Sequence, residues 1–154
     1  ARTQLGSDRI AGELRERGVA DGDIEEGLAR YGMHLGTAFQ LVDDVLDYSG
    51  DEAATGKHLG DDLAEGKPTL PLIHAMKHGS AEHASCVRHA IEAGGRDALP
   101  GVLAAIRASG ALDETRRQAE AEARLALEAI APLPPSTFRD SLVQLASFAV
   151  ARDF

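Results

Sequence analysis

The chain has 154 residues, with 25 Asp or Glu against 16 Lys or Arg, and a formal net charge of −9. This length suffices for one domain with a sizeable core, and the acidic balance argues against a general nucleic-acid binder, which would present a basic face. No run approaches the roughly 20 apolar residues that a membrane span needs. We therefore expect a soluble, cytoplasmic protein, and we expect its single cysteine, Cys86, to be a small core residue.

Helix signals follow one another along the chain, and the strand-like alternation of apolar and polar residues is absent. A first helix is predicted over about 7–17, a long one over about 23–49, and a polar, Gly-rich loop over 50–67. The later helices are predicted at about 68–78, 80–93, 97–109, 113–130 and from 136 onward, with Ser80 and Ser136 as N-caps. The fold class that these elements indicate is all-α.

The stretch FQLVDDVLDY, residues 39–48, places three aspartates in an apolar run. On a helix that turns about 100° per residue, these aspartates share an arc of roughly 100° with Gln40, and apolar residues fill the opposite side. Asp43 and Asp47 are four residues apart and repel each other. A divalent cation with hard oxygen ligands, such as Mg²⁺, would relieve that repulsion.

A solvated face of a surface helix is the alternative interpretation, and it is the usual one for an isolated DDxxD. Two observations favour a metal site. The helix is apolar around most of its circumference, and the following loop supplies Lys57 and Lys67, each beside a glycine. Cations next to a carboxylate-bound metal suit a diphosphate, whose charge must be neutralised from several sides.

A longer pattern extends over residues 36–76: FQxxDDxxD, then GK, then GDDLxEGKPTLPL. In this order and spacing it resembles the second aspartate-rich region of the trans-polyprenyl diphosphate synthase family, most closely its long-chain, octaprenyl-forming branch. The resemblance runs from about residue 20 to the C-terminus, where LVQLASFAVARDF is similar to the family's last helix. It implies an isoprenoid-synthase helical bundle, with residues 1–154 as the C-terminal portion of a single all-α domain.

The activity that the resemblance implies is that of a Mg²⁺-dependent prenyltransferase, which condenses an allylic diphosphate with isopentenyl diphosphate into a polyprenyl diphosphate. Asp43, Asp44 and Asp47 match the second DDxxD motif, which holds Mg²⁺ against the allylic diphosphate, with Asp43 as the foremost ligand. Lys57 and Lys67 match lysines that contact this diphosphate. The implied catalytic set is therefore the three aspartates with Lys57.

The implied substrate-binding set adds Gln40, which matches a glutamine beside the allylic substrate, to the two lysines. Phe39 is expected to form part of an apolar wall that shelters the carbocation and the growing chain. Asp61 and Asp62 lie in the same loop, where they either support the site or are simply solvated.

The family's first aspartate-rich motif and its isopentenyl diphosphate site have no counterpart here, because the sequence holds one DDxxD. We therefore interpret the chain as a C-terminal half that needs its missing N-terminal half for activity. The alternative is a non-catalytic subunit that pairs with an active synthase; a terpene cyclase of the same fold would use an Asn/Ser/Glu metal motif, and none is evident. The family also implies a homodimer. The product length and the allylic primer are left open.

His74 and His78 are four residues apart on one predicted helix, a spacing that can bind zinc. No acidic partner completes a zinc ligand set around them, so we do not expect zinc.

Overall fold

The structure is a computed structural model that describes residues 12, 16, 18, 21–49, 58–94 and 96–152. Most of the helix predicted over 7–17 and the whole segment 50–57 therefore lie outside the described residues. The helices are α2 (Asp21–Ser49), α4 (Asp61–Ala64), α5 (Leu70–His78), α6 (Ala81–Ala93), α7 (Leu99–Ser109), α8 (Ala111–Ala129) and α9 (Thr137–Val150). The described ranges contain no strand, so the predicted all-α class is confirmed.

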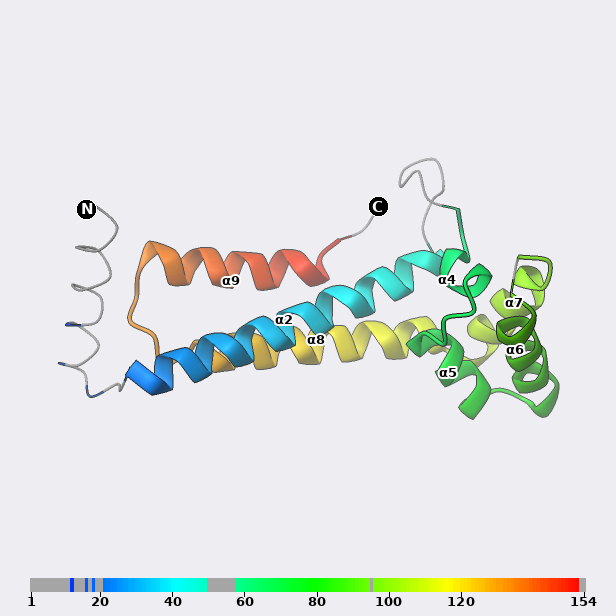
Figure 1. Cartoon of the computed structure of the whole chain (residues 1–154), viewed down its shortest axis with the longest axis horizontal. Coiled ribbons are helices and arrows are strands. Elements are labelled where there is room, and N and C mark those ends of the chain that lie inside the picture. The colour runs from blue at the N-terminus through cyan, green and yellow to red at the C-terminus, as the bar shows by residue number, and fades with distance from the viewer. Residues whose placement is uncertain are drawn as a thin grey trace.

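The two longest helices, α2 and α8, lie side by side along most of their length, and α9 packs along the same pair (Figure 1). The helices α5, α6 and α7 gather at the other end of the molecule, where α2 ends and α8 begins (Figure 1). Small buried residues recur every three or four positions on α8, at Thr115, Ala119, Ala123 and Ala126. This spacing gives α8 a narrow, flat stripe that lets α2 approach closely.

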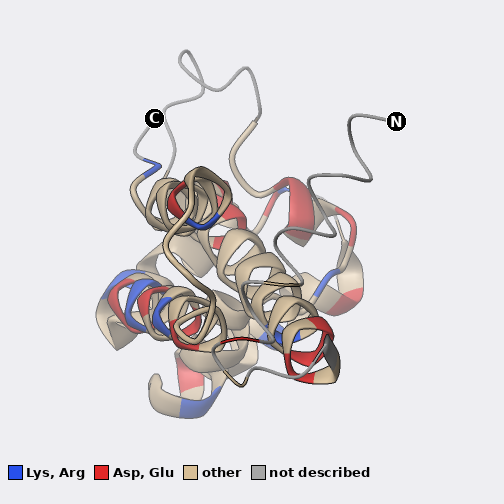
Figure 2. Cartoon of the chain, turned by 90° about the vertical axis from the view of Figure 1, so that its left-hand side faces the viewer, with Lys and Arg blue, Asp and Glu red and all other residues tan. Residues whose placement is uncertain are grey.

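Acidic and basic residues alternate along α8, and Figure 2 shows the two kinds of charge as coloured bands on the ribbon. Arg116 pairs with Asp113 at 3.3 Å, and Arg117 pairs with Glu114 at 2.5 Å. Such exposed pairs contribute little to stability and mark a solvated face. Within the described ranges, no helix is both long and apolar enough to cross a membrane.

Two apolar clusters form the core. The larger one joins the end of α2 to α4, α5, α6, α7 and the first residue of α8, and its largest members include Tyr48, Leu63, Leu72 and Ile106. The smaller one lies toward the opposite end of α2 and contains Tyr31, Ala126, Ile130 and Ala146. The Tyr31 hydroxyl donates a hydrogen bond of 2.7 Å to the carbonyl of Leu142, which fixes α9 against α2.

Local capping chemistry sets several helix ends as predicted. The Ser80 hydroxyl accepts from the His83 amide at 3.2 Å, and the Ser136 hydroxyl accepts from the Arg139 amide at 3.2 Å. The prediction of a continuous loop over 50–67 was wrong for part of its length, because α4 forms within it. Cys86 is half-buried rather than enclosed in the core.

Candidate functional site

Asp43, the first aspartate of the DDxxD motif, faces the end of α9. Its Oδ1 lies 2.8 Å from Nη2 of Arg152, two residues beyond that helix. The same Nη2 donates to the Phe39 carbonyl at 3.3 Å, and the guanidinium carbon lies 3.7 Å from the centre of the Phe39 ring. Sequence reasoning missed Arg152, because no local spacing connects it with a residue 109 positions earlier.

Asp44 is the most enclosed aspartate of the motif, with 6% of its surface exposed. Its Oδ1 accepts from Nε2 of Gln40 at 2.9 Å, and its Oδ2 lies 3.5 Å from the Leu70 amide, where α5 begins. Burial raises the pKa of Asp44 above its ordinary value, and these two donors oppose the rise. Gln40 therefore lies beside the motif as predicted and orients its second carboxylate.

The side chain of Asp47 caps the N-terminus of α4. Its two carboxylate oxygens accept from the amides of Asp61 at 3.1 Å and Asp62 at 3.3 Å. Its own carbonyl accepts from the Gly60 amide at 2.9 Å, and the left-handed φ of 77° at Gly60 turns the chain into this contact. Burial, followed by the nearby charge of Asp62, raises the pKa of Asp47 to about 6, although the two amides lower it.

Of the two lysines predicted to contact the diphosphate, the structure describes one. Lys57 lies outside the described residues. Lys67 is exposed and pairs with Glu65 at 2.6 Å and Asp62 at 3.2 Å, and its hydrogen bond to Glu65, then that to Asp62, raises its pKa. The carboxylate of Asp62 thus contacts Lys67 while its charge acts on Asp47. Sequence reasoning had left a supporting role for Asp62 open beside simple solvation.

The three aspartates point toward two different neighbours: Asp43 toward the chain end beyond α9, and Asp44 and Asp47 toward α4 and α5. No group of three or more His, Cys, Asp or Glu side chains in the described part of the chain is arranged to hold a metal ion. The donor set nevertheless suits Mg²⁺, because that ion usually takes one or two protein carboxylates and completes its shell with waters and substrate phosphates. Asp43 is the best placed for this role, since it is less buried than Asp44 and does not cap a helix as Asp47 does.

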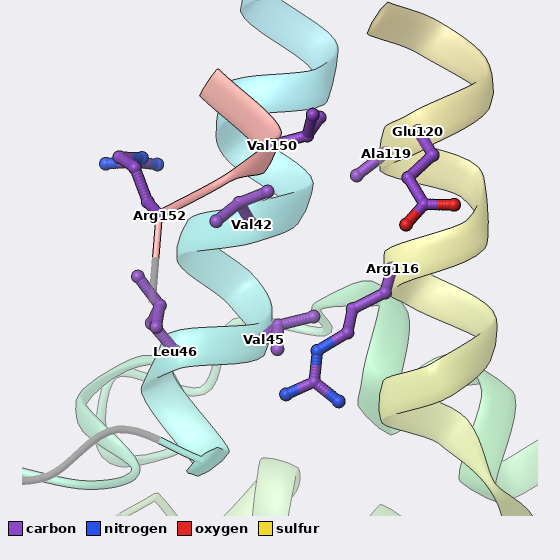
Figure 3. A pocket seen from close by; sticks show the side chains of 8 residues that line it. All are labelled: Val42, Val45, Leu46, Arg116, Ala119, Glu120, Val150 and Arg152. Carbon is purple, nitrogen blue, oxygen red and sulfur yellow. The ribbon is translucent and has the colours of Figure 1, made fainter. Parts of the chain in front are cut away.

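A pocket and a pair of histidines are two further features of the described residues. A pocket between α2, α8 and the end of α9 is lined by the apolar side of α2 (Figure 3). Its lining residues are Val42, Val45, Leu46, Arg116, Ala119, Glu120, Val150 and Arg152. His74 and His78 stack with ring centres 4.4 Å apart, and Nε2 of His74 lies 3.2 Å from the Ser109 carbonyl.

Phe39 was expected to form part of an apolar wall. It is 42% exposed, and Arg152 covers one face of its ring. Several other large apolar side chains on the same helix and on α9 are also exposed: Leu28, Met33, Phe138, Val143, Leu145 and Phe148. The molecule therefore presents exposed apolar side chains along α2 and α9.

Comparison with known proteins gives a consistent result. The family model of polyprenyl synthetase matches residues 13–106. Octaprenyl diphosphate synthase of Escherichia coli (strain K12) is 55% identical over 130 residues, which are 84% of this chain and 40% of that protein. The chain thus spans about two fifths of the length of such curated relatives.

Solved structures agree with the fold. The polyprenyl synthase from Caulobacter crescentus CB15, complexed with calcium and isoprenyl diphosphate, matches with a TM-score of 0.77 and 40% identity, over 86% of this chain and 41% of that one. The geranylgeranyl pyrophosphate synthase from Corynebacterium glutamicum, complexed with isoprenyl diphosphate and magnesium, matches with a TM-score of 0.75 and 31% identity, over 88% and 39%. The helices described above therefore have the arrangement of the corresponding part of these enzymes.

Proposed function

The chain belongs to the polyprenyl synthetase family, and we propose that it is the portion of a prenyltransferase that binds the diphosphate of an allylic substrate. The observation that carries the proposal is the arrangement of the DDxxD motif. Its three carboxylates lie where α2 meets the starts of α4 and α5 and the end of α9. Residues 1–154 would then be the C-terminal portion of one all-α domain.

Mg²⁺, when bound, would supply positive charge to the diphosphate as the allylic carbon–oxygen bond breaks. Asp43 is the proposed direct ligand, and Asp44 and Asp47 complete the acidic environment that favours a cation. Lys67 is exposed near the same acidic cluster, so its ammonium group can move from Glu65 and Asp62 to a more highly charged phosphate. Lys57 is assigned the same role from the sequence alone.

The apolar part of the substrate would lie against the exposed face of α2. Phe39 offers its ring one turn before Asp43, so an allyl group held near the metal would meet an aromatic face. Gln40 is fixed by Asp44 and keeps its remaining polar groups near the same position. These two residues would orient the allylic carbon and exclude water from the developing cation.

The remaining parts of the reaction require residues outside this chain. The relatives are longer, and the apolar side chains exposed on α2 and α9 are suited to pack against further helices of a complete synthase. We propose that those helices bring the first aspartate-rich motif and the isopentenyl diphosphate site, and that two complete domains form a homodimer. The alternative, a non-catalytic subunit that pairs with an active synthase, has no specific need of a DDxxD motif or of Lys67.

The test is the incorporation of labelled isopentenyl diphosphate with Mg²⁺ and an allylic diphosphate. The chain is assayed alone and mixed with a matching N-terminal half. Activity in the mixture alone supports the proposal, and Asp43→Asn should abolish it, whereas Asp140→Asn, an exposed carboxylate on α9, should leave it unchanged. Activity of a mixture that survives Asp43→Asn would contradict the proposed ligand. A well-folded but inactive mixture would favour the non-catalytic subunit.

A further inference from the structure

Arg152 places a positive charge on the first aspartate of the motif. Its side chain is 10% exposed and that of Asp43 is 32% exposed, so the pair is substantially shielded from water. The guanidinium covers one turn of α2, because it contacts the carbonyl and ring of Phe39 and the carboxylate of Asp43 four residues later. No other arginine of the described chain forms an ion pair with an aspartate of the motif.

A cation at this position has a clear electrostatic role. Asp43, Asp44 and Asp47 are like charges on one arc of a helix, and Asp62 adds a fourth. The guanidinium offsets part of this repulsion when no metal is present. A divalent cation that binds Asp43 needs the same carboxylate and carries the same sign of charge, so the two cations compete for Asp43 and each weakens the binding of the other.

We propose that Arg152 is a latch, which holds Asp43 in the metal-free chain and must be displaced before a divalent cation can bind that aspartate. This inference rests on the proposed function, in which Asp43 is the metal ligand. In this proposal the Arg152 guanidinium and a divalent cation from solution compete for the carboxylate of Asp43. Metal would then move the end of the chain away from α2.

The position of Arg152 allows its side chain to be released from Asp43 without unfolding α9. It follows the end of α9, so its release requires a change in the short non-helical segment after Val150 and leaves the helix in place. Its Nε is buried and has no hydrogen-bond partner among the described residues. An unsatisfied buried donor favours the released state, where water can reach it.

The experiment measures Mn²⁺ binding to the full chain by the electron paramagnetic resonance signal of the free ion. Wild type is compared with Arg152→Met, which keeps the length and removes the charge, and with Arg152→Lys, which keeps the charge without the planar fork. Arg124→Met, at an exposed arginine that lies 3.7 Å from Glu128 on α8, is the matched control. Asp43→Asn tests the metal site itself.

If the latch is closed in about nine tenths of the molecules, Arg152→Met should bind Mn²⁺ roughly tenfold more tightly than wild type. Arg152→Lys should be intermediate, and Arg124→Met should equal wild type. In EDTA, Arg152→Met should also unfold at a lower temperature than wild type, and saturating Mn²⁺ should remove the difference. If Arg152→Met does not fold, tighter binding by Arg152→Lys supports the latch and unchanged binding overturns it.

Two results separate the latch from the proposed function. Equal Mn²⁺ affinity in wild type and Arg152→Met, together with loss of binding in Asp43→Asn, overturns the latch and leaves the metal site standing. Weak binding that no variant changes, Asp43→Asn included, overturns both, because Asp43 is then not the ligand.

Discussion

Replacing Asp47 by Asn should change how the stability of the metal-free chain depends on pH. The pKa of Asp47 is raised from 3.8 to about 6 in the folded chain, mainly by burial. Folding therefore favours the protonated carboxyl. The stability that this preference contributes is fully present below pH 3.8 and is lost as the pH rises through about 6. The side-chain amide of Asp47→Asn is neutral at every pH, so the stability of the variant does not fall in this way as the pH rises.

The size of the effect follows from the two pKa values. A shift from 3.8 to about 6 corresponds to an upper limit of about 3 kcal/mol. Asp47 is only partly buried, and solvent screening reduces the value, so we expect about 1.5 kcal/mol. The variant also loses one of the two carboxylate acceptors for the amides of α4, at a cost of about 1 kcal/mol where the wild-type side chain is ionised and less where it is protonated.

The assay is urea unfolding in EDTA at pH 4 and pH 8, followed by circular dichroism. Asp47→Asn should be close to wild type in stability at pH 4, and it should gain stability relative to wild type on going to pH 8, because only the wild type loses the contribution of about 1.5 kcal/mol. Asp140→Asn, an exposed carboxylate on α9, serves as the control and should not alter the pH dependence relative to wild type. A gap between Asp47→Asn and wild type that is the same at both pH values would refute the reasoning.

Three further substitutions test the backbone turn before α4 and the cap of α9. Gly60→Ala should lower the free energy of unfolding by about 1–2 kcal/mol, because φ is 77° there and an added Cβ would lie 2.8 Å from Cδ1 of Leu99; Gly36→Ala, in helix α2 with open space around it, should instead raise it by up to about 1 kcal/mol. Urea denaturation compares them, and equal effects of the two would contradict the strain at Gly60. Ser136→Ala should cost about 1 kcal/mol through loss of the α9 cap, measurable as a lower melting temperature, and an unchanged melting temperature would show that Ser136 contributes no cap energy.

The features that were predicted correctly depend on residues close together in the sequence. The three- and four-residue spacing of apolar side chains determines α2, and Ser80 and Ser136 cap their helices through amides three positions later. Gln40 and Asp44 lie one helical turn apart on the arc that the sequence predicts, and their hydrogen bond, which was not itself predicted, fits that local geometry. The DDxxD motif could be identified because its residues are also close together in the sequence.

The features that were missed depend on contacts between distant segments. A four-residue helix such as α4 carries almost no periodic signal, and it forms because Asp47 accepts its first amides and Gly60 provides the turn. The pairing of Arg152 with Asp43 depends on how α9 packs back along α2, which no short spacing encodes. The metal roles of the aspartates and the role of Lys57 stay predictions.

The two apolar clusters also affect how the regions on either side of the DDxxD motif unfold. Only α2 and α8 contribute described residues to both clusters, and every other described helix contributes its buried cluster residues to one of them at most. Each cluster can therefore open as its own cooperative unit. Asp43 contacts the chain end beyond α9, whereas Asp44 and Asp47 contact the α4–α5 side. Asp43 thus couples the two units through Arg152, and a cation that displaces Arg152, as proposed above, would loosen that coupling and let the two units unfold more independently.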